Sequence, residues 1–274
     1  MKNQFRHITL ALSLLFSLGL LAQNYTVTPS GVKAKTEGLE LEIQFLSPEI
    51  VRVVKFPEGI TPDKKSLSVV KTPENIQITT EKSNEVLSLK SAALNVRLNL
   101  QTGKVTFLTL NNKALFTEKD FGTQFTPTMD VKKNSYTVRQ AFKLDKKEAI
   151  YGLGQIQNGK LNQRGERIVL KNENMKIAIP FFQSVKGYGV FWDNYAPVTF
   201  NDNAQELSLE SLGDLSDYYF MYGGNAAGVV AQMRDLTGEA PMIPLWGVGY
   251  MQSRERYKTQ FETVDVLKKY RDLN

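Results

Sequence analysis

The sequence contains no cysteine and only one histidine, His7. Because His7 lies in the basic start of the chain, the sequence from Gln23 onward has neither residue type. This absence excludes disulfides, thiolate chemistry, a Ser-His-Asp triad, a Cys-His pair and the usual zinc sites. Any acid–base chemistry here must rest on Asp, Glu, Lys or Tyr.

The chain also lacks a dense block or helical stripe of one charge. Its net charge is +6, and removal of Lys2 and Arg6 with the first 22 residues would leave +4. The lysines are spread over loops and strand edges, so the sequence predicts no nucleic-acid partner. Chemistry based on carboxylates alone is typical of glycosidases.

Long apolar runs are absent except at the beginning. Residues 8–21 are mostly apolar, follow Lys2 and Arg6, and precede the small residue Ala22. This run is short for a membrane span and has the flanks of a signal peptide. We therefore expect residues 1–22 to be a signal peptide and the product to be exported, periplasmic or extracellular. No membrane span is expected after signal removal, and a retained membrane anchor is the alternative.

Short strands at regular spacing are predicted from about residue 39 to residue 221. Residues 39–45 (LELEIQF) alternate strictly, and pairs such as Ile76 and Ile78 repeat that spacing. Turn residues, among them Thr102-Gly103 and Asn111-Asn112, separate the runs. Many short strands with no helical period among them predict an antiparallel β-sandwich.

The pattern changes near Gly223-Gly224. Asn225 is expected to cap a helix over 226–236 that ends at Gly238. A buried strand over 246–250 and an amphipathic helix from about Lys258, with a capping box at 259–262, are expected to follow. One strand and one helix are the opening unit of a parallel α/β structure. We expect a β-sandwich domain over 23–240 and a truncated second domain over 241–274.

Three motifs have simpler explanations than a functional site. YGLGQ at 151–155 lacks the third glycine and the helix of a dinucleotide-binding loop, and GGNAAG at 223–228 lacks the Lys-Ser/Thr of a phosphate loop. The second is better explained as a turn and a helix start. Trp192 could stack on a sugar, although an isolated tryptophan is more often part of a core.

Seven segments taken in order carry a stronger signal. They are YGLGQ (151–155), NQRG (162–165), IPFFQS (179–184), YGVFWDN (188–194), DYYFMYG (217–223), LTG (236–238) and PLWGVGYMQSRERY (244–257). The series resembles glycoside hydrolase family 31, the retaining α-glucosidases and α-xylosidases. The resemblance is loose over the whole mature chain and close over 150–274. The QSRERYK variant with NQRG upstream is most similar to exported α-xylosidase-type members of the Bacteroidetes.

The resemblance implies a galactose-mutarotase-like β-sandwich followed by the first βα unit of a (β/α)8 TIM barrel. In this family an aspartate nucleophile and an aspartate acid/base stand at the ends of later barrel strands, beyond Asn274. The resemblance therefore places no catalytic residue in this chain, and we expect the chain to be inactive alone. It requires no cofactor and no metal, and implies an oligosaccharide substrate; the oligomeric state stays open.

The resemblance carries over to four substrate-binding positions. Family members usually place an acidic residue on a sandwich loop over the barrel mouth, and Asn174 matches that position; an ordinary turn asparagine is the alternative. Gln252, Arg254 and Glu255 follow the first barrel strand, where loops line the active-site face of a barrel. Glu255 replaces an aromatic residue that the family commonly has, which puts a plain glucosidase pocket in doubt. Glu255 could instead be a solvated loop charge, and Arg254 could brace the loop.

The function that these expectations favour is that of the amino-terminal portion of an exported retaining α-glycosidase. Its substrates would be terminal α-xylosidic or α-glucosidic bonds of oligosaccharides. A non-catalytic carbohydrate-binding β-sandwich and an inactive gene remnant are the alternatives. The exposed apolar face expected on the last helix argues against a chain that is complete as written.

Overall fold

The computed structural model of the protein describes residues 24–36 and 38–273. The expected signal peptide, residues 1–22, lies outside the described residues. The chain divides into two compact units, of which the first ends at Gly238 and the second runs from Glu239 to Asn274.

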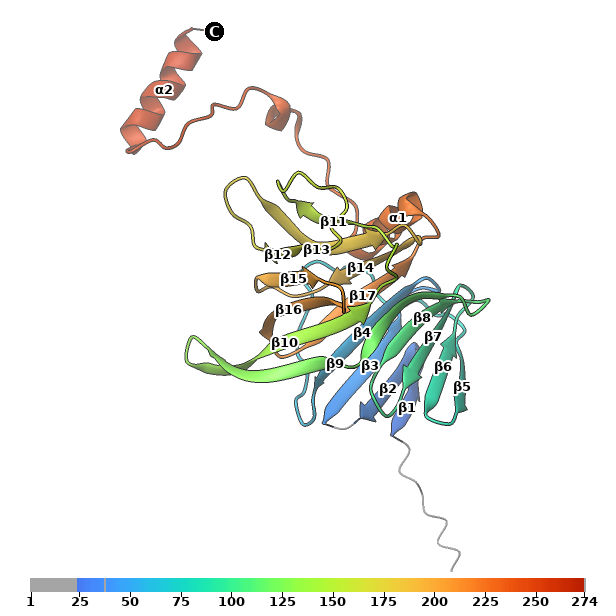
Figure 1. Ribbon diagram of the computed structural model, residues 1–274. Helices are drawn as coiled ribbons and strands as arrows, with labels where there is room; N and C mark the ends of the chain where they lie inside the picture. Colours follow the sequence, from blue (N-terminus) through green and yellow to red (C-terminus); the bar gives the residue numbers. More distant parts are fainter. Residues whose placement is uncertain (1–23, 37, 274) are drawn as a thin grey trace, which may run out of the picture. The chain divides into compact units, whose positions relative to one another are not determined.

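Two antiparallel sheets form the described part of the first unit, as the sequence predicts (Figure 1). In spatial order, the eight-stranded sheet of these residues consists of β1 (Tyr25–Thr28), β2 (Gly31–Thr36), β3 (Leu39–Phe45), β4 (Ile50–Pro57), β17 (Ser216–Tyr222), β14 (Tyr188–Trp192), β13 (Ile177–Ser184) and β11 (Ile150–Gln155). The nine-stranded sheet consists of β12 (Arg167–Leu170), β15 (Val198–Asp202), β16 (Leu207–Gly213), β10 (Lys133–Lys143), β9 (Ala114–Asp130), β8 (Val105–Thr109), β7 (Leu94–Asn99), β6 (Val86–Lys90) and β5 (Thr79–Ser83).

The main core lies between the two sheets. The predicted apolar face of β3 contributes Leu41, Ile43 and Phe45, all buried. Burial of such side chains stabilises the fold by roughly 1.5–3 kcal/mol each. Ile76 and Ile78 pack against this core from irregular chain rather than from the predicted strand, since the nearest strand begins at Thr79. Ile76 N–H bonds locally to the carbonyl of Glu74 instead of to a neighbouring strand.

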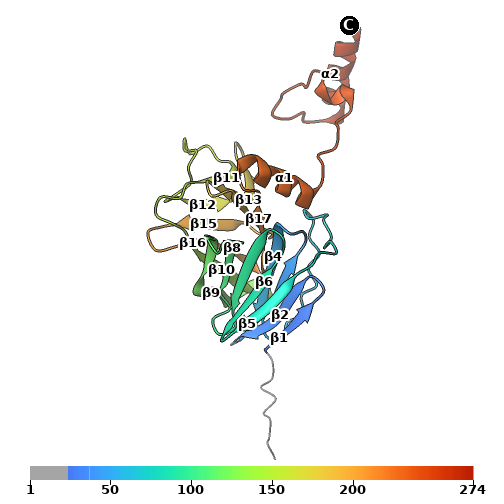
Figure 2. The ribbon, with the colours of Figure 1, turned by 90° about the vertical axis from the view of Figure 1, so that its right-hand side faces the viewer.

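Helix α1 (Ala226–Thr237) confirms the predicted helix. Asn225 accepts a hydrogen bond from Gly228 N–H, and Gly238, with a positive φ of 85°, ends the helix and donates its N–H to the Arg234 carbonyl. Leu236 packs with Ile50 and Tyr219 in a second cluster on the eight-stranded sheet. The helix therefore covers part of that sheet (Figure 2).

The second unit contains a 3₁₀ turn over Leu245–Val248 and helix α2 (Gln260–Asp272). The predicted helix start is confirmed in its first half, because Thr259 accepts from Glu262 N–H; the Glu262 carboxylate accepts from Lys258 N–H, one residue before the cap that a capping box would use. The predicted buried strand over 246–250 is wrong: the described segment is exposed and contains no strand. A parallel strand obtains its hydrogen bonds from neighbouring strands, and the described residues place none beside it.

Candidate substrate-contacting segments

Asn174 stands at the tip of the turn that joins β12 to β13. Glu173 and Lys176 pair across this turn through two backbone hydrogen bonds and a 2.8 Å ion pair. The Asn172 side chain accepts from Ala178 N–H at 2.7 Å, and Met175 adopts a left-handed conformation with φ of 64°. The turn thus holds Asn174 exposed on the first unit, where it is available to a ligand.

Gln252 and Arg254 belong to a polar cluster on the second unit. The Gln252 oxygen accepts from Tyr250 Oη at 2.6 Å and from Tyr270 Oη at 2.7 Å. The Arg254 guanidinium pairs with Glu262 at 2.6 Å and lies over the Tyr257 ring. These contacts tie the loop to the start and the end of α2.

Glu255 lies in the same loop and is exposed. Gln252, Arg254 and Glu255 therefore share one segment of the second unit, whereas Asn174 belongs to the first unit. The role of each in substrate binding stays a prediction.

The motifs YGLGQ and GGNAAG and the residue Trp192 all have roles in the fold rather than in ligand binding. YGLGQ forms β11, whose pairing with β13 is interrupted by a bulge at Leu153. A Cβ on Gly154 would come within 2.1 Å of the Ile177 carbonyl oxygen, so glycine permits the close approach of the two strands. Gly223 and Gly228 bring the end of β17 against the start of α1 in the same way. Trp192 is fully buried and donates to Ser211 Oγ at 3.3 Å, which excludes sugar stacking on its ring.

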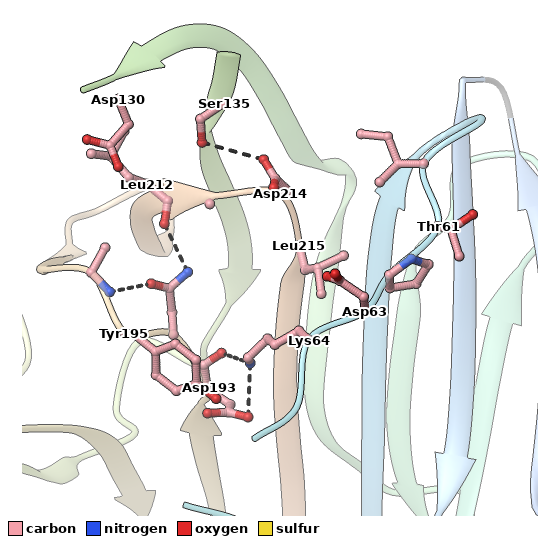
Figure 3. A pocket seen from close by; sticks show the side chains of 15 residues that line it. Thr61, Asp63, Lys64, Asp130, Ser135, Asp193, Tyr195, Leu212, Asp214 and Leu215 are labelled. Atoms are coloured by element: carbon pink, nitrogen blue, oxygen red, sulfur yellow. Dashed lines mark hydrogen bonds and ion pairs between the residues drawn. The ribbon is translucent and has the colours of Figure 1, made fainter. Parts of the chain in front are cut away.

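A cleft of about 330 Å³ opens on the first unit between the loop 60–64 and the strand ends near 130, 193 and 212 (Figure 3). Tyr195, 54% exposed, forms one wall, and Lys64 lies with its Nζ 5.3 Å from the ring centre. In Figure 3 the Lys64 ammonium points at Asp193, whose Oδ2 is 2.9 Å away.

Lys64 also pairs with Asp217 at 2.9 Å, and Asp217 receives two hydrogen bonds from Arg52. This ion network fastens the 60–64 loop to β14 and β17, so its charges are largely committed to the fold. The cleft is therefore a structural junction in which the exposed Tyr195 and nearby acidic side chains are the groups open to a ligand.

A buried polar cluster that sequence reasoning missed lies inside the sandwich. Lys55 and Glu118, with side chains 2% and 0% exposed, pair at 2.5 Å between the two sheets. Tyr218 Oη donates to Glu118 Oε1 at 2.7 Å, and Val105 N–H donates at 2.7 Å to Oε2, the oxygen that pairs with Lys55. Burial lowers the pKa of Lys55, although Glu118 opposes that shift, and burial raises the pKa of Tyr218 well above its usual value.

A signal for this cluster is present in the sequence. Lys55 continues the inward period of Val51 and Val53 on β4, and Glu118 continues that of Phe116 on β9. A charged residue at a core-facing position indicates a buried partner of opposite charge.

Glu148 forms a second buried polar cluster at the β13–β14 turn. Its carboxylate accepts from Ser184 Oγ at 2.6 Å and from Tyr188 Oη, and pairs with Lys186 at 3.0 Å. Burial and the Glu148 charge raise the pKa of Tyr188. Both clusters are closed by protein partners, which is typical of structural rather than catalytic groups.

Within the described residues, no cluster of three or more Asp, Glu or His side chains has the arrangement of a metal site. In the same part of the chain, neither helix has the length and apolar character needed to cross a bilayer.

This chain is similar in sequence to proteins of one glycosidase family. Residues 40–201 match the model of the glycosyl hydrolase 31 N-terminal galactose mutarotase-like domain. The chain is 34% identical over 246 residues to an α-xylosidase of Saccharolobus solfataricus, a match that covers 85% of this chain and 33% of the relative. It is 29% identical over 243 residues to α-glucosidase 2 of Bacillus thermoamyloliquefaciens, covering 82% of this chain and 30% of that protein.

Solved structures show the same fold. A family 31 α-xylosidase from a soil metagenome, solved with xylose, superposes with a TM-score of 0.76 at 21% identity. The match covers 90% of this chain and 39% of that structure. The galactose-mutarotase-like sandwich is thereby confirmed. The chain spans about a third of the length of the two curated relatives.

Proposed function

Because the chain belongs to glycoside hydrolase family 31, we propose that it forms the amino-terminal β-sandwich of an exported retaining α-glycosidase. The proposed substrates are oligosaccharides with terminal α-xylosidic or α-glucosidic bonds. The observation that carries this proposal is the 34% identity over 246 residues to an α-xylosidase. The match to an α-glucosidase supports the alternative sugar within the same reaction class.

The reaction would proceed by two displacements. In retaining glycosidases, two carboxyl groups about 5–5.5 Å apart act as nucleophile and as acid then base. We assign neither role to a residue of this chain, since the carboxylates of its buried clusters are held by protein partners. The chain by itself is then expected to bind sugar at most, without cleaving it.

In the proposed glycosidase, the role of this chain would be to shape the substrate pocket. Asn174, held at the tip of a braced turn, supplies an amide to a sugar hydroxyl. Gln252 has its oxygen engaged by two tyrosines, so its Nε2 is the group that donates to substrate. Arg254 braces the loop through Glu262, which leaves the exposed Glu255 as the hydrogen-bond acceptor.

Export is a separate part of the proposal. The basic residues Lys2 and Arg6 before the apolar run 8–21 support a cleaved signal peptide. Expression in a bacterial host, cell fractionation and amino-terminal sequencing test it. We expect a periplasmic or extracellular product that begins at Gln23, and an uncleaved cytoplasmic product would contradict export.

The main experiment starts with the coding sequence past Asn274. We expect it to continue into a (β/α)8 barrel with an aspartate at the end of a strand. The whole product should hydrolyse an aryl α-xyloside or α-glucoside and release the α-anomer first, as followed by proton NMR. The chain ending at Asn274 should show no turnover on either substrate. Turnover by that chain would contradict our assignment of the carboxylates, and an immediate stop codon would favour a carbohydrate-binding module or a gene remnant.

Glu255 can be tested in the whole product. Loss of one charged hydrogen bond to substrate costs about 1.5–3 kcal/mol, so we expect Glu255→Ala to lower kcat/KM by about 10- to 100-fold. Glu85→Ala, which removes an exposed carboxylate from the β5–β6 turn, is the matched control and should leave kcat/KM unchanged. Equal kinetics for both variants would make Glu255 a solvated loop charge.

A further inference from the structure

A second cleft of the first unit has a lining unlike that of the cleft in Figure 3. It has a volume of about 290 Å³ and opens between the end of β2, the start of β3, the end of β4, the β7–β8 turn and the hairpin β9–β10. We call it the aromatic cleft; its lining residues include Phe121, Phe125, Tyr136, Gln101, Thr102 and Thr123.

Phe121 is the most exposed ring of the aromatic cleft, at 62%. It lies in a bulge of β9, because Glu118 pairs with Phe142 and Thr123 pairs with Gln140, which leaves 119–122 opposite Ala141 alone. Phe121 has a φ of 51°, in the left-handed region that a bulky residue rarely adopts. Bulges re-aim side chains, and this one directs a phenyl ring into a solvent-facing cleft where it buries little of its own surface.

Phe125 and Tyr136 form the fixed part of the lining. Their rings meet edge to face at 5.8 Å, and both pack against the main core while remaining partly exposed. The cleft thus combines two anchored aromatic rings with one exposed ring.

The polar groups of the aromatic cleft are neutral. Gln101, Thr102 and Thr123 contribute an amide and two hydroxyls. Charged groups beside the lining are paired with each other, Lys104 with Asp120 at 3.0 Å and Lys55 with Glu118 at 2.5 Å. Thr123 Oγ is held in place by donation to Gln140 at 2.6 Å and acceptance from Lys55 at 3.1 Å.

We propose that the aromatic cleft is a non-catalytic binding site for one neutral pyranose unit of an oligosaccharide. Aromatic rings pack against the C–H faces of a sugar ring, while amide and hydroxyl groups hydrogen-bond its hydroxyls. A cleft of this volume lies near the lower limit for small-molecule sites, which suits a single ring. The paired charges give no attraction for an ionic ligand.

The aromatic cleft is lined by none of the four residues that we propose to contact substrate. Its lining residues lie between 36 and 136, whereas Asn174 follows β12 and Glu255 lies in the second unit. The proposal rests only on the residues that line the aromatic cleft. It can therefore fail while the proposed glycosidase function stands, and the glycosidase function can fail while the cleft still binds a sugar.

The test is an NMR titration of the ¹⁵N-labelled chain with D-glucose, D-xylose and maltotriose as probes. We expect saturable shifts, in the millimolar range, at residues of the aromatic cleft. Phe121→Asn removes the ring and suits the left-handed backbone, since asparagine tolerates this conformation. It should weaken binding about tenfold, whereas Phe121→Trp should retain binding.

Phe261→Ala is the matched control, because Phe261, 71% exposed, is also a solvent-facing phenylalanine and lies on α2. It should leave the titration unchanged. The absence of saturable shifts with all three sugars would overturn the proposal. Shifts that map elsewhere, or that persist undiminished in Phe121→Asn, would overturn it as well. None of these outcomes depends on hydrolysis by the whole product.

Discussion

The buried Lys55–Glu118 pair is an energetically costly arrangement of two single residues in the sandwich. Each charge loses its hydration, and only complete hydrogen bonding offsets that loss. Lys55 Nζ also donates to the Gly103 carbonyl and to Thr123, while Glu118 accepts from Tyr218 and Val105. The pair therefore links β4, β8, β9 and β17 across both sheets.

Removing one charge of this pair should destabilise the protein strongly. In Lys55→Met, Glu118 remains buried without its cation, and we expect a loss of about 3–5 kcal/mol in the free energy of unfolding. In Lys55→Met/Glu118→Gln, the amide oxygen still accepts from Tyr218, so much of that loss should be recovered. Urea unfolding followed by circular dichroism measures both.

The exposed pair Lys90–Glu81, at 3.2 Å, is the control for this experiment. Lys90→Met should change stability by less than about 1 kcal/mol. A loss in Lys55→Met as small as in Lys90→Met would contradict the burial of the pair.

At this scale the sequence predicts apolar burial better than polar burial. The alternation in 39–45 is sufficient to place Leu41, Ile43 and Phe45 in the core. The partners of Lys55 lie 48, 63 and 68 positions away along the chain, so only the folded topology brings them together. Trp192 shows the same limit, because its Ser211 partner lies on the other sheet.

Among the elements, β11 is one whose geometry requires glycine. Gly152 and Gly154 have φ values of 124° and 91°, and Leu153 between them has a φ of 67°. This bulge turns Leu153 into the main core, where it is fully buried. The motif thus secures an edge strand of the eight-stranded sheet.

Gly154→Ala should damage this element. The added Cβ would approach the Ile177 carbonyl oxygen to 2.1 Å in a left-handed backbone, so overpacking and strain act together. We expect a loss of about 2–4 kcal/mol in unfolding free energy. Hydrogen exchange should show lower protection in β11 and β13, the paired strands.

Gly159→Ala separates the two causes. Gly159 also has a left-handed φ, of 70°, but a Cβ there meets nothing within 4 Å. Only backbone strain of about 1–2 kcal/mol is expected. Equal losses in both variants would show that the approach of β11 to β13 is looser than described.

The sequence predicts the helices well, because capping residues mark where each helix begins or ends. Asn225 and Gly238 bound α1, and Thr259 with Glu262 starts α2, because these caps act within one turn of helix. The strand that the pattern predicts over 246–250 is not formed, since a strand depends on partners that local sequence does not specify.

At the scale of the whole molecule, the order of short strands predicts a sandwich but not its pairing. β4 pairs with β17, although 158 residues lie between Pro57, the end of β4, and Ser216, the start of β17. Pairings of this kind come from the resemblance to a family, not from periodicity. The same resemblance selected Asn174, Gln252, Arg254 and Glu255, for which local sequence alone gives only turn or loop residues.

The sandwich as a whole should lose stability at alkaline pH through its buried tyrosines. Burial, reinforced by the charges of Glu148, Glu118 and Asp217 respectively, raises the pKa of Tyr188, Tyr218 and Tyr219 above the usual 10.0. Below that value these phenols are neutral in the folded and unfolded states. Above it the unfolded state ionises first, so their contribution to stability is lost as the pH rises.

We expect the Tm to fall steeply above about pH 10, and three of the 11 tyrosines to ionise only as the fold is lost. Ultraviolet absorbance of tyrosinate, recorded beside circular dichroism over a pH titration, measures both quantities. In Tyr188→Phe the fall in Tm should be shallower, because one titrating phenol is gone while its ring still fills the core. Complete ionisation of all tyrosines near pH 10 with the fold intact would contradict the buried hydrogen bonds to Glu118 and Glu148, and with them the closed packing of the two sheets.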